Sequence, residues 1–382
     1  MNTLPPIATA SAAGRDFSQE HAGGEGLPRP TSMRAAVYRG IDDVRVETVP
    51  VPDIGPGELL VRIDTCGVCG TDLKKIHTGS HTAPRIFGHE MAGTVAEVGD
   101  GVTGFRVGDR VMAYHHMPCE DCFYCRKQTF AQCEAYKNVG CTAGFAPSGG
   151  GFAEYIRVMD WIVRRGVVKI PDGIPFEQAA FLEPVNTCYK AVRKLGLQAD
   201  ETVLVIGQGP IGILLAALAR RTGATVLTSD LYPERHAIAA NFGLRHSLDA
   251  REDVVSAAHA ATSGRGADVA LVAVAGNALI KVAMDAIRPG GRVVLFAQTQ
   301  HGEAPFDPGA VCMDEKTLMG SYSSSVAIQD EVAEMVFDGY RSGFDLTRLI
   351  SHRFALEDAV AAINLASNPQ PGSMKIVIQP GI

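Results

Sequence analysis

The chain has 382 residues, of which 46% are hydrophobic and 20% charged, and its formal net charge is -7 at pH 7. This length exceeds one core of ordinary size, so we expect two domains. The negative charge argues against a nucleic-acid or anionic-membrane partner, because either surface would repel the chain. The longest apolar run, 211–219, is far too short to span a bilayer.

Residues 1–32 are rich in Ala, Gly, Pro and Ser and lack the charged start and apolar stretch of a signal peptide. We predict that this segment is a disordered leader and that the first strand opens at Met33. The nine cysteines are unevenly spread along the chain. That distribution favours metal binding in a reducing compartment over a disulfide framework, so we predict a cytoplasmic protein.

In the first third of the chain, short β-type runs are separated by Gly and Pro, which predicts a small twisted β-domain. The segment 114–133 is polar and rich in cysteine, and a metal would supply the order there that a core cannot. The predicted strands are 33–38, 44–49, 59–63, 93–98, 110–113, 152–158 and 161–168, and a helix is predicted over 176–194.

From Thr202 onward, apolar strands alternate with stretches of helix length. This alternation predicts parallel strands with right-handed crossovers, as in a doubly wound sheet. The predicted strands are 202–206, 225–229, 268–274, 292–297 and 316–322, and the predicted helices are 210–221, 233–242 and 277–287. The tail adds two predicted helices, 328–340 and 357–366, and a final strand, 374–378.

A glycine-rich turn follows the first strand of this region and opens a helix rich in Leu and Ala, which is the context that a dinucleotide-binding turn requires. Gly207 permits a tight turn, Gly209 lets the backbone approach a diphosphate, and Gly212 lets helix and strand pack closely. The amino terminus of the helix then faces the phosphates. The predicted cofactor-binding residues of the turn are Gly207, Gly209, Ile211 and Gly212.

The next strand ends in Asp230, where a carboxylate can bind both hydroxyls of the adenosine ribose. The same carboxylate would repel a 2′-phosphate, so NAD is favoured over NADP. Arg235 leaves the second cofactor open, because its guanidinium can stack on adenine or partly accommodate a phosphate.

Four cysteines, at positions 119, 122, 125 and 133, supply enough soft ligands over a short span to close a tetrahedral zinc site. Such a site has no position for water and is structural. Disulfides are disfavoured by the expected compartment, and an iron–sulfur cluster is the other reading of the spacing. A zinc-ribbon module for nucleic acid is disfavoured by the acidic chain.

A second, open zinc site is predicted around Cys69 and His89, which come from two separate segments. Glu183, a carboxylate among apolar residues, is the candidate third ligand, with an ordinary helix-facing acid as the equal alternative. Glu90 is a direct or water-mediated ligand in this prediction. Asp72 is placed to hold the outer nitrogen of His89 and fix its tautomer.

Together these motifs resemble the medium-chain zinc-dependent alcohol dehydrogenases and, within them, the sorbitol (polyol) and threonine dehydrogenase branch. The resemblance extends from Met33 to the end of the chain. It is carried by the segments 69–72, 88–90, 119–133, 150–155, 183–184 and 207–212. It implies a GroES-like β-rich catalytic domain, 33–185 and 326–382, split around a Rossmann domain, 186–325, with the tail returning to the first domain.

The resemblance also implies an activity, in which an alcohol binds zinc, loses its proton through a neighbouring hydroxyl and passes hydride to the nicotinamide. Thr71 matches that hydroxyl, and Glu183 replaces the third-ligand cysteine, as in the polyol branch. Lys74 stands where a relay histidine is common. Gly70 stands where a basic residue often contacts the diphosphate.

We therefore predict two zinc ions per chain and oxidation of a secondary alcohol, of polyol or sugar-alcohol type, to the ketone with NAD. The expected partner is this small alcohol, and the expected assembly is a homodimer or homotetramer, because relatives form both. Threonine and simple secondary alcohols are alternative substrates. A metal-free reductase and a non-catalytic, zinc-stabilised NAD sensor are the alternatives of other kinds.

Overall fold

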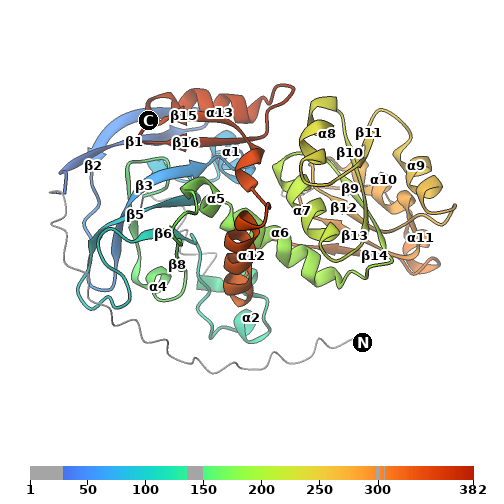
Figure 1. The fold of residues 1–382 in the computed structure, drawn as a ribbon, viewed down its shortest axis with the longest axis horizontal. Helices are drawn as coiled ribbons and strands as arrows, with labels where there is room; N and C mark the ends of the chain where they lie inside the picture. Colours follow the sequence, from blue (N-terminus) through green and yellow to red (C-terminus); the bar gives the residue numbers. More distant parts are fainter. Residues whose placement is uncertain (1–28, 136–148, 298–301, 305) are drawn as a thin grey trace.

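The computed structural model describes residues 29–135, 149–297, 302–304 and 306–382. It contains two bodies side by side, one rich in strands and one with alternating strands and helices (Figure 1). The predicted leader over 1–28 lies outside the described residues. Arg29 already belongs to the first body, because its guanidinium donates to the carbonyls of Val51 and Pro52 and pairs with Asp53.

The first body is built on two sheets. A three-stranded sheet has the order β2-β1-β4, and a second sheet has the order β15-β16-β3-β5-β6-β8, with β7 paired to β3. The strands are β1 Ser32–Gly40, β2 Asp43–Pro50, β3 Leu59–Gly67, β4 Arg85–Ile86, β5 Glu90–Val98, β6 Arg110–Ala113, β7 Tyr155–Val158, β8 Val167–Lys169, β15 Ile350–Ala355 and β16 Lys375–Gln379. Apolar residues at alternate positions of these strands form its core.

The carboxyl-terminal strand returns to this first body, as predicted. β16 pairs antiparallel with β3, with Val377 opposite Gly67, and parallel with β15. The tail thereby joins a sheet whose other strands lie more than 200 residues earlier in the sequence. The start of β16 is consequently brought next to the end of β3.

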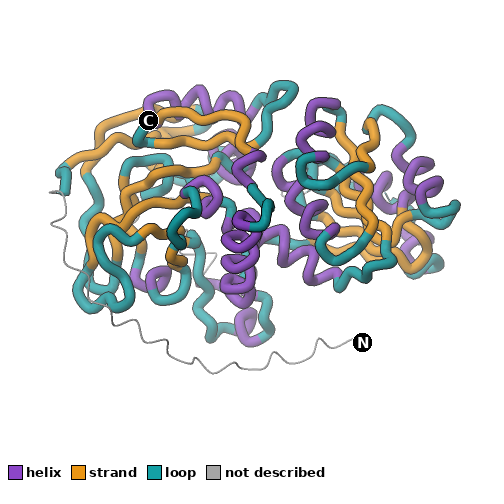
Figure 2. Tube along the Cα trace, viewed as in Figure 1, coloured by secondary structure: helices purple, strands orange, loops and turns teal. Residues whose placement is uncertain are grey.

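The second body is a six-stranded parallel sheet of order β11-β10-β9-β12-β13-β14, flanked by helices (Figure 2). This is the predicted doubly wound sheet, and the order reverses between β9 and β12. Its elements are β9 Thr202–Ile206, α7 Pro210–Arg220, β10 Thr225–Asp230, α8 Pro233–Ala240, β11 His246–Asp249, α9 Val254–Ala261, β12 Ala267–Val272, α10 Ala278–Ala286, β13 Ile287–Leu295, α11 Pro308–Cys312 and β14 Thr317–Gly320.

Two helices, α6 (Leu182–Leu195) and α12 (Gln329–Arg341), lie between the two bodies (Figure 1). α6 packs against both α7 and α12. The remaining helices are α1 Gly70–Thr78, α2 Phe123–Arg126, α4 Asp160–Val163, α5 Phe176–Ala180 and α13 Ala359–Ser367, with short 3-10 turns η1 Phe130–Gln132, η2 Val326–Ile328, η3 Leu346–Leu349 and η4 Leu356–Asp358. The predicted domain boundaries at 185/186 and 325/326 stay predictions, because the chain crosses there within or beside these helices.

Two predicted elements differ from the structure. The predicted strand 161–168 is instead the short helix α4 followed by β8, and this helix buries Ile162 and Val163. The predicted helix 176–194 is two helices, α5 and α6, which meet at Phe181. Pro184 explains the break, because a proline at the third position of α6 has no N–H to donate to the preceding turn.

Gly212 offers a test of the close packing between α7 and the turn before it. A Cβ at Gly212 would lie 1.8 Å from the carbonyl oxygen of Gly207, whereas a Cβ at Gly209 meets nothing within 4 Å. We expect Gly212→Ala to lower the free energy of unfolding by about 1–3 kcal/mol. Gly209→Ala is the matched control and should leave it unchanged in urea unfolding. Equal stability of the two variants would contradict this packing.

Candidate functional site

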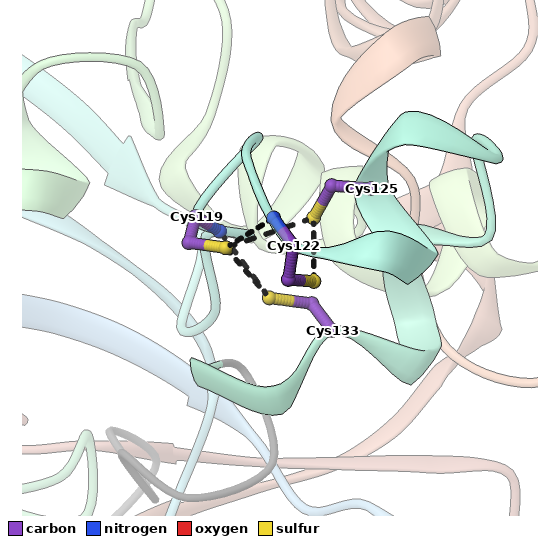
Figure 3. A group of neighbouring side chains, drawn as sticks. All are labelled: Cys119, Cys122, Cys125 and Cys133. Carbon is purple, nitrogen blue, oxygen red and sulfur yellow. Dashed lines mark hydrogen bonds between the residues drawn. The ribbon is translucent and has the colours of Figure 1, made fainter.

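The four cysteines of the segment 119–133 converge on one point (Figure 3). The Sγ atom of Cys119 lies 4.0 Å from that of Cys125 and 3.6 Å from that of Cys133, and Cys122 lies 3.6 Å from Cys125. These separations are far longer than the S–S bond of a disulfide, about 2.05 Å. Four sulfurs around zinc, each at about 2.3 Å, lie about 3.8 Å apart, so the group fits tetrahedral zinc.

Short-range structure holds this cluster open for a metal. α2 begins directly after Cys122 and carries Cys125, and the η1 turn ends before Cys133. Backbone N–H groups of Cys119 and Cys122 donate to the sulfurs of Cys133 and Cys119, respectively. Such donors stabilise thiolates, which are the form that binds zinc.

The predicted open site is also brought together. Ligand atoms of Cys69, His89 and Glu90 all lie within 4.8 Å of one another. Cys69 directly precedes α1, and His89 directly precedes β5, so two rigid elements place the two side chains. His89 is 5% exposed and Glu90 1%. A soft sulfur, an imidazole and a carboxylate are the donors that zinc uses in proteins.

Asp72 lies behind the metal-binding group and is fully buried. One carboxylate oxygen is 2.9 Å from Nδ1 of His89, and the other accepts the backbone N–H of Cys69 at 3.2 Å. An N–H at Nδ1 leaves Nε2 of His89 with a lone pair for a metal. The geometry is therefore that predicted for Asp72.

Glu183 lies at the beginning of α6 but outside the group of three. Its Oε1 is 4.0 Å from Nδ1 of His115, and Oγ1 of Thr187 donates to it at 3.4 Å. Burial raises the pKa of Glu183 to about 7, although nearby His89 acts in the opposite direction. Its ligation of zinc stays a prediction.

Glu90 is engaged by a residue that we had not predicted. Lys375, at the start of β16, forms an ion pair with Oε2 of Glu90, and its Nζ also donates to the carbonyl of Val68 at 3.1 Å. Both side chains are more than nine-tenths buried. The signal in the sequence was a single lysine in an otherwise apolar strand, since a buried lysine requires a partner.

A cleft of about 210 Å³ connects the metal-binding group with the second body. Its lining combines residues of the predicted open zinc site, the dinucleotide turn and the tail. They include Cys69, Glu90, Pro210, Ile211, Arg235 and Lys375. Both predicted sites therefore face one space.

The glycine-rich turn has the predicted conformation. Gly207 has a φ of 98°, which is the left-handed region that glycine adopts freely, and its N–H donates to the carbonyl of Ser229 at 2.8 Å. α7 begins directly after Gly209, with Pro210 at its first position. Its unpaired N–H groups point toward the cleft end of the sheet.

Asp230 ends β10 and already has several partners. Its carboxylate accepts from the backbone N–H of Gln208 at 2.7 Å and of Tyr232 at 3.0 Å, and it pairs with Nη1 of Arg235 at 3.2 Å. The guanidinium of Arg235 lies 4.8 Å from the ring centroid of Tyr232. The charge of Asp230 is thus partly offset, and its ribose contact stays a prediction.

The other predicted residues of this region lie on α1. Thr71 is exposed on the first turn of α1, and Lys74 is half-buried further along it. A Cβ at Gly70 would meet nothing within 4 Å. Cys66, which the sequence analysis left unassigned, is fully buried, and burial raises the pKa of its thiol.

Comparison with known proteins decides the family. Residues 55–172 match the alcohol dehydrogenase GroES-like domain, and residues 210–338 match the zinc-binding dehydrogenase domain. The chain is 30% identical to (R,R)-butanediol dehydrogenase of Bacillus subtilis (strain 168), over 91% of its own length and 100% of the relative. The chain belongs to the zinc-binding alcohol dehydrogenase family.

Two further comparisons are consistent with this family. Sorbitol dehydrogenase of Bacillus subtilis (strain 168) is 29% identical over 92% of this chain and 98% of the relative. The structure of a zinc-binding dehydrogenase from Sinorhizobium meliloti 1021 bound to NADP superposes with a TM-score of 0.81 at 29% identity, covering 92% of this chain and all of that one. The predicted fold and the predicted alcohol dehydrogenase class are thereby confirmed.

Membership of this family describes an enzyme whose two domains match the two bodies of the structure. Within the described residues, every helix falls short of the length and apolar character that a membrane crossing requires. The comparisons do not distinguish NAD from NADP for this dehydrogenase.

The raised pKa of Glu183 predicts a pH dependence of the metal-free dehydrogenase. Between pH 4.5, the ordinary pKa, and pH 7, the folded state keeps a proton that the unfolded state has lost. The free energy of unfolding should therefore fall as pH rises through this window, by a total of about 3 kcal/mol. Glu183→Gln should remove this fall, as measured by urea unfolding at each pH after chelation of metal.

The exposed carboxylate Glu334 provides the control for this measurement. Glu334→Gln should keep the pH dependence of the unaltered chain. If Glu183→Gln kept it as well, the carboxyl of Glu183 would not carry the proton.

Proposed function

We propose that this dehydrogenase oxidises a secondary alcohol of the polyol type to the ketone, with NAD as hydride acceptor. One observation carries the proposal: Cys69 and Glu90 line the same cleft as Pro210 and Ile211 of the dinucleotide turn. A metal-bound hydroxyl and a nicotinamide held at these two places would share one enclosed space. A non-catalytic NAD sensor would not need a metal-binding group facing its cofactor.

Cys69 and His89 are the proposed protein ligands of a catalytic zinc, with Glu183 as the third. A bound zinc acts as a Lewis acid that makes a coordinated alcohol more acidic. Glu90 lies on the side of Lys375 and is a ligand only when that ion pair opens. The four cysteines of the segment 119–133 are the proposed ligands of a structural zinc.

The protein's own groups position the reactants in this proposal. Thr71, on the first turn of α1, accepts the hydroxyl proton of the alcohol. Asp72 fixes the ring of His89 through the 2.9 Å hydrogen bond, so Nε2 is directed at the metal. The buried surroundings exclude water and strengthen each electrostatic contact.

The cofactor is proposed to lie along the cleft, with its diphosphate at the amino terminus of α7 and its adenosine ribose at Asp230. Gly70 lacks the basic side chain that often contacts the diphosphate. Lys375 and Arg235 line the cleft and supply positive charge in its place. The carboxylate of Asp230 favours NAD, while Arg235 beside it keeps NADP as the second candidate.

We further propose a cytoplasmic homodimer or homotetramer. Among the described cysteines every thiol is free, which suits a reducing compartment. β14 ends the six-stranded sheet, and such an edge offers unpaired backbone groups to a second copy.

The function is tested by NAD reduction with a panel of polyols, simple secondary alcohols, threonine and sugars, repeated with NADP. We expect turnover with polyols and NAD, and two zinc ions per chain by elemental analysis. Cys69→Ser should lose one zinc and nearly all turnover, because a hydroxyl is a poorer zinc ligand than a thiolate. Exposed Cys312 gives the matched control, and Cys312→Ser should keep both zinc ions and turnover.

The outcome against this proposal is also specific. If Cys69→Ser kept both zinc content and turnover, the open site would not be catalytic. If the unaltered chain reduced neither cofactor with any alcohol of the panel, the proposed substrate class would be wrong.

The role of Lys375 is tested by equilibrium binding of NADH at several salt concentrations. Lys375→Met should weaken NADH binding about tenfold and reduce the salt dependence, because a charge-assisted contact to phosphate is lost. Lys375→Arg keeps the charge and should bind nearly normally. Lys281→Met removes an exposed lysine elsewhere and is the control. Unchanged NADH binding by Lys375→Met would contradict this role.

A further inference from the structure

His115 lies directly beside the proposed zinc site, although no role has been assigned to it above. Its ring centroid is 4.7 Å from that of His89 and 4.1 Å from that of His116, so the imidazole is packed between two others. The preceding residue, Tyr114, is anchored to the backbone of Gly166 at 2.8 Å. The position of His115 is thus determined by the end of β6 and by its two ring neighbours.

The side chain of His115 is 11% exposed, and its Nδ1 atom makes no hydrogen bond within the described part of the chain. The nearest carboxylate oxygen, Oε1 of Glu183, is 4.0 Å away, which is too long for a hydrogen bond. A buried polar atom of this kind costs free energy unless it finds a partner. A ligand or a water is therefore expected at Nδ1.

A small cavity adjoins His115 on the side of His89. Its volume is about 20 Å³, and its lining includes Gly88, Met91 and both histidines. That volume holds a group about the size of one water molecule. Arg157, another polar lining residue, is already committed to both carboxylate oxygens of Glu58 at 2.7 and 2.9 Å.

The cavity and the cofactor cleft have different linings around the metal-binding group. Cys69 and Glu90 line the cleft that contains the dinucleotide turn, whereas His89 and His115 line the smaller cavity. A substrate oxygen at the zinc would therefore have the nicotinamide toward the cleft and His115 toward the cavity. The next carbon of the substrate can place a second hydroxyl in that cavity.

We propose that His115 determines substrate specificity by hydrogen bonding, through Nδ1, to the hydroxyl on the carbon next to the one that is oxidised. This inference rests on the proposed function and narrows it from secondary alcohols to vicinal diols and polyols. No covalent step involves His115. A mono-alcohol would leave Nδ1 unsatisfied, and that loss is the source of discrimination.

The test compares (R,R)-2,3-butanediol with 2-butanol, which differ by one hydroxyl. For each variant, the ratio of kcat/KM for the diol to kcat/KM for the mono-alcohol is measured. His115→Phe should lower this ratio at least about tenfold, because the ring is kept and the hydrogen bond is lost. His115→Asn places an amide near Nδ1 and should restore most of the ratio.

Exposed His352 supplies the control, and His352→Phe should leave the ratio unchanged. Calorimetric binding of the diol gives a readout besides turnover, and elemental analysis shows whether each variant keeps its zinc. His115→Phe should retain zinc and bind the diol more weakly. If this variant does not fold, the result with His115→Asn decides.

The failures of the two proposals are distinguishable. A chain that oxidises both alcohols, with a ratio that neither His115 variant changes, overturns the role of His115 and leaves the dehydrogenase function standing. A ratio that falls equally in His115→Phe and His115→Asn shows a packing role and also overturns it. An unaltered chain that oxidises neither alcohol overturns the function and the inference together.

Discussion

The buried carboxylate of Asp72 is the contact on which the metal-binding group depends. It accepts the N–H of Cys69 and lies 2.9 Å from Nδ1 of His89, so it joins the two segments that supply the proposed ligands. These segments are separated by 20 residues of sequence and belong to different elements, α1 and β5. A single fully buried anion therefore fixes both the position of the loop and the tautomer of the imidazole.

A second buried charge contact joins the tail to this centre. Lys375 at the start of β16 pairs with Glu90 at the start of β5, and β16 reaches this place only because it pairs with β3. The last strand is therefore part of the candidate active site as well as of the sheet. Because Lys375 also lines the cofactor cleft, the state of the metal-binding group and the binding of an anionic cofactor are electrostatically coupled.

Sequence patterns predicted the parts of the molecule in which local chemistry and local structure agree. The four-cysteine segment, the turn from Gly207 to Gly212 and the alternating strands and helices have short-range signals that survive in the structure. The pairing of Lys375 with Glu90 and the stacking of His115 on His89 could not be predicted, because each joins segments that meet only in the tertiary fold. The strand predicted over 161–168 was wrong for a related reason: burial of Ile162 and Val163 suits a strand or a short helix equally.

The four-cysteine lobe has a consequence for how the chain matures. Its sulfurs lie 3.6–4.0 Å apart, and Cys119 is exposed. Until metal arrives, a newly made chain carries neighbouring thiols within reach of one another, and an oxidant can join them in pairs. Zinc delivery thus protects the nascent enzyme from being trapped in an oxidised form that can no longer take up its metal.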